Sequence, residues 1–171
     1  MGLLHRHLPS FEEPVEMLGA CHDNVRRFSR LLVALAERLE QGPVGPETAQ
    51  MAADILRYFA DAAPHHHADE EQDLFPRLRE LGDAALNAIL DRLLEEHRHM
   101  AALWARLQPI LQTLAAMRAA RLSRQEAQAF ADLYQQHARE EDEVVYPHAR
   151  HLAGELLQAI GRRMAERRGV H

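Results

Sequence analysis

The chain has 171 residues, a length typical of one domain, and 47% of them are hydrophobic while 27% are charged. Its net charge of −6 argues against a general nucleic-acid binder, because phosphate backbones attract basic surfaces. Residues 1–10 lack the apolar run of a signal peptide, and no stretch approaches the ~18 apolar residues of a membrane span. Together with the single cysteine, Cys21, these features predict a cytoplasmic protein without an intrachain disulfide or a membrane partner.

The first half of the chain carries helical periodicity in two long stretches. The first predicted helix covers residues 13–40 and ends at the Gly- and Pro-rich stretch 41–46. The second begins near Glu47. We expect Pro64 to kink it and Pro76 to stop or bend it, because proline removes a helical hydrogen bond.

The second half repeats this arrangement after a turn at Gly82 and Asp83. A third helix contains Pro109, and Ser123 opens a fourth helix that ends or bends near Pro147. Long amphipathic helices with short connections predict an all-α, up-down-up-down antiparallel four-helix bundle with a short additional C-terminal helix. The predicted division is an N-terminal segment at 1–12, the bundle at 13–152 and a C-terminal helical tail at 153–171.

The tail is amphipathic and closes on two pairs of arginines, at 162–163 and 167–168. We expect it to pack across the bundle or to serve as an interface. Its basic residues are interpreted as a solvated helix end, since positive charge is favourable at a helix C-terminus, with anion binding as the alternative.

An internal repeat divides the chain into two similar halves. Segments 66–76 and 137–147 align at an offset of 71 residues, and both carry His-x-x-x-Glu followed by an aromatic residue and proline. His22 and His97 correspond upstream at an offset of 75 residues. Each half is therefore predicted to supply two helices to one shared centre.

Histidines and glutamates on the apolar helix faces are the candidate metal ligands. A His and a Glu four residues apart share one helix face, but with 26 acidic residues in the chain this spacing is weak evidence. The stronger argument is that imidazoles and carboxylates inside a bundle are costly unless a metal satisfies them. The predicted ligands are His22, His66, Glu70, His97, His137 and Glu141.

Other interpretations of these residues stay open. His67 competes with His66, because a small helix rotation would exchange them. A lone histidine on an apolar face is usually a hydrogen-bonded core residue, and a buried free cysteine such as Cys21 usually behaves as a small hydrophobe, although it could sense redox state without a metal. Tyr146 is interpreted as a core residue whose hydroxyl finds a partner. The duplicated pattern favours metal binding over these alternatives.

The number of candidate ligands indicates two ions. Six ligands exceed the four of a tetrahedral zinc site and match two metals roughly 3.5–4 Å apart, with Glu70 and Glu141 as natural bridges. Imidazoles and carboxylates suit iron, manganese or zinc.

The chain resembles the hemerythrin-like, or HHE cation-binding, family. The resemblance covers roughly residues 15–150 and is carried by segments 21–26, 66–76, 96–97 and 137–147. It implies a four-helix bundle with a non-haem di-iron centre, so that two iron ions become the expected cofactor, with zinc or manganese as alternatives.

The resemblance also implies a function. Similar family members are associated with oxygen carriage, oxygen or redox sensing, iron handling and responses to nitric oxide. We therefore expect a di-iron protein that binds or senses O₂, NO, redox state or another small anionic ligand, more in the manner of a sensor than an enzyme. The alternatives are a di-iron oxidoreductase that reduces peroxide or NO, an iron storage or delivery protein, and a metal-free interaction module.

One departure from the family concerns the third helix. Oxygen-carrying hemerythrins have His-x-x-x-His there, whereas His97 is followed four residues later by Ala101. We expect residue 101 to lie on the same face as His97, so that one ion loses an imidazole unless His99, water or another residue replaces it. This argues against a dedicated oxygen carrier. The cysteine-containing N-terminal segment of iron–sulfur repair relatives also has no counterpart here, which argues against that role.

Overall fold

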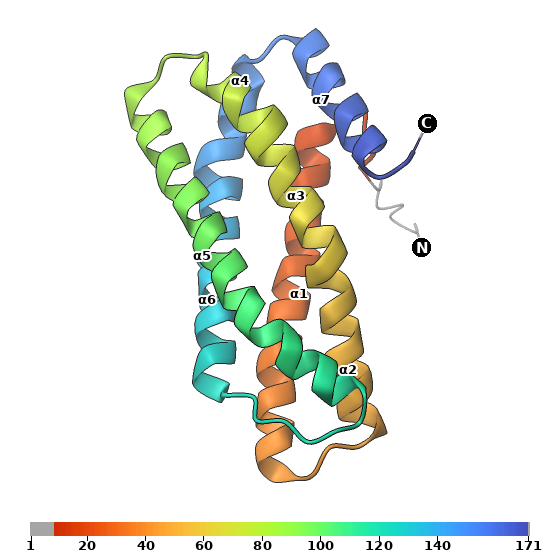
Figure 1. Cartoon of the computed structure of the whole chain (residues 1–171). Coiled ribbons are helices and arrows are strands. Elements are labelled where there is room, and N and C mark those ends of the chain that lie inside the picture. The colour runs from red at the N-terminus through yellow and green to blue at the C-terminus, as the bar shows by residue number, and fades with distance from the viewer. Residues whose placement is uncertain (1–8, 171) are drawn as a thin grey trace, which may run out of the picture.

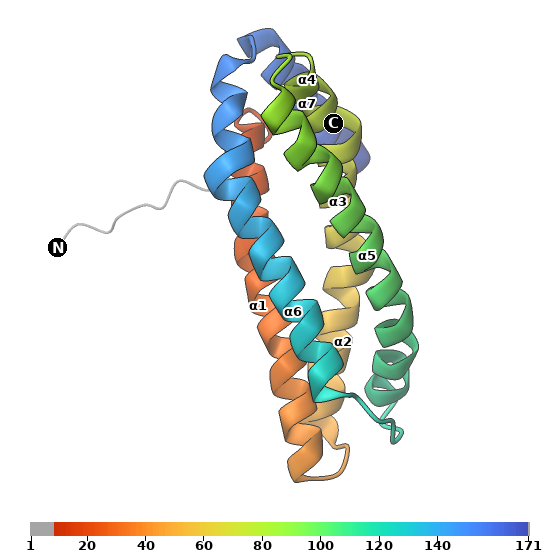
Figure 2. The same cartoon turned by 90° about the vertical axis from the view of Figure 1, so that its left-hand side faces the viewer.

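Four long helical arms lie side by side through residues 9–170, the part of the chain that the computed structural model describes (Figures 1 and 2). Successive arms run in opposite directions, which confirms the predicted all-α antiparallel bundle with its additional C-terminal helix. Most of the predicted N-terminal segment 1–12, with His5 and His7, lies outside the described residues, as does His171.

Each arm is built from one or more helical elements. The first arm is α1 (Pro14–Gln41), the third is α5 (Ala84–Ala115), and a shorter helix α7 (Gly154–Arg167) crosses the end of the bundle. The second arm consists of α2 (Pro46–Arg57), η1 (Tyr58–Ala62), α3 (Ala63–Asp69), η2 (Glu70–Leu74) and α4 (Phe75–Arg79). The fourth consists of α6 (Arg124–Glu140), η3 (Glu141–Val145) and η4 (Tyr146–His151).

Widened π-helical turns accommodate prolines in the second and fourth arms. Proline lacks an N–H and crowds the carbonyl four residues before it, and a turn with i→i+5 bonding relieves this crowding. The second arm therefore passes both Pro64 and Pro76 and continues to Arg79, where the sequence predicted a stop or bend. The π turns η1, η2 and η3 each end two residues before a proline, namely Pro64, Pro76 and Pro147.

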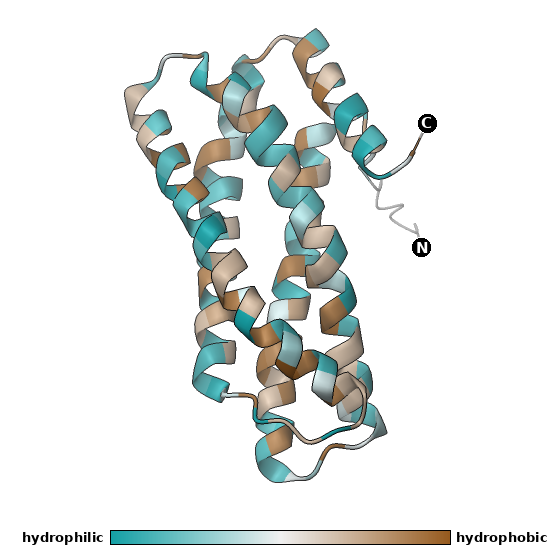
Figure 3. Ribbon diagram, in the orientation of Figure 1, coloured by the Kyte–Doolittle hydropathy of each residue, from teal (hydrophilic) through white to brown (hydrophobic). Residues whose placement is uncertain are grey.

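Two apolar clusters fill the bundle above and below a layer of polar side chains. The α2-side cluster joins α1, α2, α5 and α6 around residues such as Leu32, Ile55 and Phe130. The α7-side cluster joins α4, the start of α5 and α7 around residues such as Leu90 and Met164. Hydrophobic and hydrophilic residues are interspersed along each helix (Figure 3), as expected of amphipathic helices. Each buried leucine stabilises the fold by roughly 1.5–3 kcal/mol.

The C-terminal helix α7 packs closely against the N-terminal part of the described chain. At Gly161 a side-chain Cβ would lie 1.8 Å from the carbonyl oxygen of Phe11, so only glycine permits this approach. The sequence expectation that the tail packs across the bundle is consistent with this contact.

The arginines of α7 bind carboxylates of the second arm. Asp69 and Asp73 are buried, and Arg167 donates hydrogen bonds to both. Arg168 donates to Asp69 at 2.6 Å, and Arg163 lies 2.7 Å from Asp73. The interpretation of these basic residues as a solvated helix end is wrong for Arg167 and Arg168, because they neutralise two buried aspartates, and α7 is thereby fixed to the arm that carries His66 and Glu70.

Candidate metal centre

The polar layer between the two apolar clusters contains all six candidate ligands. Each is at most 3% exposed, although all are polar or ionisable. Side chains from all four arms contribute to the layer: His22 from α1, His66 from α3, Glu70 from η2, His97 from α5, His137 from α6 and Glu141 from η3.

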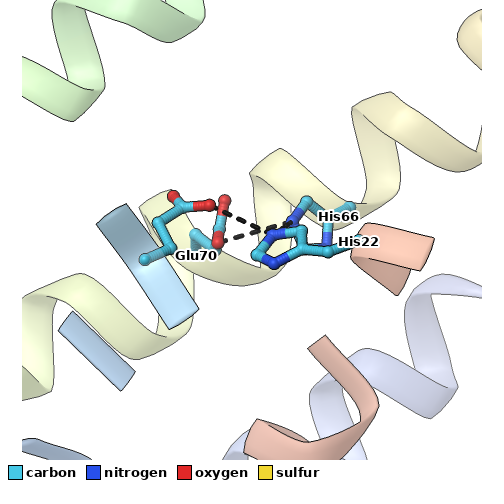
Figure 4. Close-up of side chains that lie close together, drawn as sticks. His22, His66 and Glu70 are labelled. Atoms are coloured by element: carbon cyan, nitrogen blue, oxygen red, sulfur yellow. Dashed lines mark hydrogen bonds and ion pairs between the residues drawn. The ribbon is translucent and has the colours of Figure 1, made fainter. Parts of the chain in front are cut away.

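These side chains form two overlapping groups with metal-binding geometry. Within each group the potential ligand atoms lie within 4.8 Å of one another. The half-site A contains His22 and His66, the half-site B contains His97 and His137, and both include Glu70 and Glu141. Figure 4 shows His22, His66 and Glu70 pointing toward one another from different helical turns.

Imidazole nitrogens face each other in pairs at the middle of each half-site. The Nε2 atoms of His22 and His66 lie 3.1 Å apart, and those of His97 and His137 lie 2.9 Å apart. Glu141 spans both pairs, with Oε1 at 2.9 Å from His137 Nε2 and Oε2 at 3.1 Å from His22 Nε2.

Glu70 spans the two half-sites in the same way as Glu141. Its Oε1 lies 3.5 Å from His66 Nε2, and its Oε2 lies 3.4 Å from His97 Nε2. Each carboxylate therefore directs one oxygen to each half-site, which is the arrangement of a bridging ligand.

The hydrogen bonding of this layer fits a pair of bound cations. Both oxygens of Glu141 and Oε2 of Glu70 are buried and make no well-aligned hydrogen bond among the described residues, although imidazole nitrogens lie 2.9–3.4 Å away. A buried carboxylate costs several kcal/mol unless a positive charge faces it, and without a metal each pair of facing Nε2 atoms needs a proton between them. A cation between the paired nitrogens would satisfy these nitrogens and the carboxylate oxygens together, so the residues present fit two metal ions.

Carboxylates behind three of the histidines orient their rings. The Nδ1 of His22 contacts Asp142 at 2.8 Å, and that of His97 contacts Glu71 at 2.7 Å. The Nδ1 of His137 contacts Glu96 at 2.7 Å. A ring that donates its Nδ1 proton to a carboxylate keeps the Nε2 lone pair free for a metal and becomes a stronger ligand.

The π turns explain how one short segment serves both half-sites. Because η2 and η3 begin at Glu70 and Glu141, two successive acids of each widened turn reach the polar layer, the first buried within it and the second at its partly exposed edge. The first acid enters the centre, and the second contacts a histidine of the other half of the chain: Glu71 contacts His97, and Asp142 contacts His22.

Neighbouring carboxylates favour the protonated form of three imidazoles in the metal-free layer. Burial lowers the pKa of His22, His97 and His137, but surrounding carboxylates outweigh this effect and raise the three values to about 9, 9 and 10. Burial lowers the pKa of His66, and Glu70 offsets this only partly. Burial also raises the pKa of Glu70, but the neighbouring histidines reverse this and hold it well below its usual value.

The structure distinguishes the competing residues that the sequence left open. His66 joins the cluster, whereas His67 is half-buried and stacks against the ring of His97, with centroids 4.0 Å apart. The expectation that Ala101 shares the face of His97 is wrong. Ala101 is exposed, and the side chain that continues the buried face in the next turn is Met100.

The interpretation of Tyr146 as a core residue whose hydroxyl finds a partner is confirmed, but the sequence did not place that hydroxyl at the centre. The hydroxyl of Tyr146 donates a hydrogen bond to Glu70 Oε1 at 2.5 Å and lies 3.3 Å from His22 Nε2. The repeat carries the signal that could have found it, because the aromatic residue before the proline is Phe75 in one half and Tyr146 in the other. The repeated second acids, Glu71 and Asp142, were visible in the same alignment.

The fold and this layer define a helical bundle built around a buried His/Glu centre for two metals. Comparison with known proteins agrees: the hemerythrin HHE cation binding domain matches residues 13–149, and the chain belongs to this family. It is also 32% identical over 161 residues to an uncharacterized protein of Haemophilus influenzae, covering 94% of this chain and 93% of the relative. In the described part of the chain, no helix is long and apolar enough to cross a membrane.

Proposed function

We propose that this chain is a non-haem di-iron protein that binds or senses O₂, NO or redox state. The observation that carries the proposal is the sharing of Glu70 and Glu141 between two groups of buried histidines. Each half-site then offers two imidazoles and two bridging carboxylate oxygens. Iron commonly takes five or six ligands, so this set leaves room at each ion for a small exogenous ligand.

The protein's own residues account for the properties that such a site needs. His22, His66, His97 and His137 would hold the ions, and the carboxylates behind three of them fix the ring orientations. The apolar clusters on both sides keep bulk water away from the layer. Bound iron supplies reversible one-electron chemistry and affinity for diatomic ligands.

Metal analysis and ligand titration test this proposal. Protein produced with iron available should contain about two iron ions per chain. Reduced protein titrated anaerobically with NO, and separately exposed to O₂, should show saturable changes in its visible spectrum. One zinc ion and no iron in such protein would contradict the proposal, and catalytic turnover of NO or peroxide with a reductant would assign an oxidoreductase in place of a sensor.

A further inference from the structure

The two half-sites differ in the aromatic residue that stacks on one histidine of each. In half-site A the ring of Tyr146 stacks on that of His22, with centroids 5.4 Å apart and planes at 10°. In half-site B the ring of Phe75 stacks on that of His97, at 6.2 Å and 13°. Tyr146 and Phe75 occupy equivalent positions of the repeat, 71 residues apart, so half-site A gains a phenol oxygen at a position where half-site B has a bare ring.

The hydroxyl of Tyr146 lies among the atoms that would surround the ion of half-site A. The spacings there are 3.1 Å between the Nε2 atoms of His22 and His66, 3.1 Å from His22 Nε2 to Glu141 Oε2, and 3.3 Å from His22 Nε2 to the hydroxyl. Ligand atoms bound to one ion at ~2.1 Å lie roughly 3.0–3.4 Å from their neighbours in the same coordination sphere. Relative to His22, the phenol oxygen therefore has the spacing of a further ligand, whereas its 2.5 Å separation from Glu70 Oε1 is that of a hydrogen bond and would have to lengthen.

Its neighbours place the hydroxyl on the metal-facing side of His22. The Nδ1 of His22 is engaged by Asp142, so Nε2 is the nitrogen that faces an ion, and the hydroxyl approaches that nitrogen. The hydroxyl also lies 2.5 Å from Glu70 Oε1, an oxygen directed to the same half-site. Tyr146 is buried, and its ring is fixed by the stack on His22, so the oxygen is held in this position.

We propose that Tyr146 is a protein ligand of the ion in half-site A, bound as a phenolate when that ion is ferric. The inference rests on the proposed di-iron centre. Binding to the ion would replace the O–H bond of Tyr146 by a bond to iron, the proton would be released to solvent as for other deprotonated metal ligands, and the hydrogen bond to Glu70 would be lost. A phenolate is a hard, anionic oxygen ligand that favours the ferric ion, so the two irons become inequivalent and half-site A is the more easily oxidised.

A purely structural role for Tyr146 makes a different prediction. A phenol that only donates a hydrogen bond to Glu70 gives no phenolate-to-iron charge-transfer band. A bound phenolate gives such a band in the visible, and resonance Raman excitation within it shows tyrosine ring vibrations. These are spectroscopic properties of the resting oxidised protein and require no measurement of activity.

The experiment uses iron-loaded, oxidised full-length protein. Wild-type protein should show tyrosine ring vibrations that shift when ring-deuterated tyrosine is incorporated. Tyr146→Phe should lose the band completely while retaining two irons, and Tyr134→Phe, which removes another buried phenol, should keep it. Two bound irons without tyrosine vibrations in the wild type, or a band that persists in Tyr146→Phe, would overturn the inference and leave the di-iron centre intact.

Two further measurements keep the test decisive. If Tyr146→Phe does not fold, Tyr58→Phe and Tyr134→Phe assign the band by elimination, because the chain has three tyrosines. Both variants keeping the band supports Tyr146, and loss of the band in either one contradicts it. Metal analysis separates the two proposals: fewer than two irons in wild-type protein contradicts the centre itself.

Discussion

The two half-sites share one framework but surround their ions differently. In half-site B both histidines donate through Nδ1 to a carboxylate, since Glu71 supports His97 and Glu96 supports His137. In half-site A the Nδ1 of His66 has no hydrogen-bond partner among the described residues. The two halves of the repeat thus share the framework of the centre and differ at residues beside the candidate ligands.

The missing partner of His66 can be traced to one position. Glu96 precedes His97, and the residue that precedes His22 at the equivalent position of the repeat is Cys21. Cys21 is partly buried, and burial raises the pKa of its thiol, so it is a neutral group at a position where the other half has an acid. Half-site A therefore has fewer supporting carboxylates, and it has Tyr146.

Removing a shared carboxylate should break both half-sites together. Glu141→Gln keeps the side-chain volume but removes the charge that faces both pairs of histidines. We expect metal content to fall from about two ions per chain toward zero, with a large loss of thermal stability, because ligands from separate arms are joined through the ions. Metal analysis and thermal unfolding measure both effects.

The matched variant His22→Ala removes a ligand that belongs to half-site A alone within the described centre. It should retain about one ion, held at half-site B by His97 and His137. Equal metal loss in Glu141→Gln and His22→Ala would contradict the bridging role of Glu141. His99→Ala, an exposed change on α5, serves as the control and should retain both ions.

Metal-free protein should lose stability as pH rises from about 7 to 10. The pKa values of His22, His97 and His137 are raised in the folded chain to about 9, 9 and 10. A histidine of the unfolded chain has a pKa near 6.5, so protonation of these three imidazoles stabilises the fold fully below about pH 6.5. This stabilisation disappears as the pH rises through the pKa values of the folded chain. A rise in the pKa of one group from 6.5 to about 9 corresponds to roughly 3 kcal/mol.

Urea unfolding of chelator-treated protein at several pH values measures this loss. His137→Ala should flatten the dependence, because it removes the imidazole with the highest of the three values, whereas His99→Ala should leave it unchanged. A free energy of unfolding that stays constant from pH 7 to 10 would show that the three imidazoles are already neutral in the metal-free fold.

The carboxylates that cross between the halves should matter less than the ligands. Asp142→Asn weakens the support of His22, and Glu71→Gln weakens that of His97. Each should lower metal affinity about 10- to 100-fold at the half-site of the histidine that it contacts. Competition with a chelator measures the affinities, Glu143→Gln on the exposed side of η3 is the control, and equal loss at both half-sites would contradict the assignment.

The smallest expected effect comes from making the two halves more alike. Cys21→Glu places an acid at the position equivalent to Glu96, which contacts His137, so the repeat predicts that it reaches the unpartnered Nδ1 of His66. It should tighten metal binding at half-site A by up to ~10-fold, whereas Cys21→Ser should change little. Weaker binding in Cys21→Glu than in Cys21→Ser would show that the pocket beside His66 does not admit a carboxylate.

The sequence was sufficient to predict the bundle and to select the six clustered residues. Helical periodicity identifies the arms, and the 71-residue repeat distinguishes His66 and Glu70 from the neighbouring His and acid pairs. Both signals are local or periodic, and they do not depend on how the arms are rotated about their axes.

Side-chain orientations and contacts that depend on how each arm is rotated about its axis could not be predicted from these sequence signals. Ala101 was placed beside His97 from its four-residue spacing, but α5 turns Met100 inward and leaves Ala101 exposed. The contact between Tyr146 and Glu70 joins residues 76 positions apart, so no local pattern reports it. The arginines of α7 likewise find Asp69 and Asp73 only once the helix has folded back.

The polar layer also determines how cooperatively the molecule unfolds. It lies between the α2-side cluster and the smaller α7-side cluster, and aromatic rings of both clusters pack against its histidines. When ions join the four arms at this level, the two clusters should open as one unit. Without them, the α7-side cluster should exchange its amide hydrogens at a lower free energy than the α2-side cluster, so the metal centre acts as the cooperative link between two separately stabilised ends of one bundle.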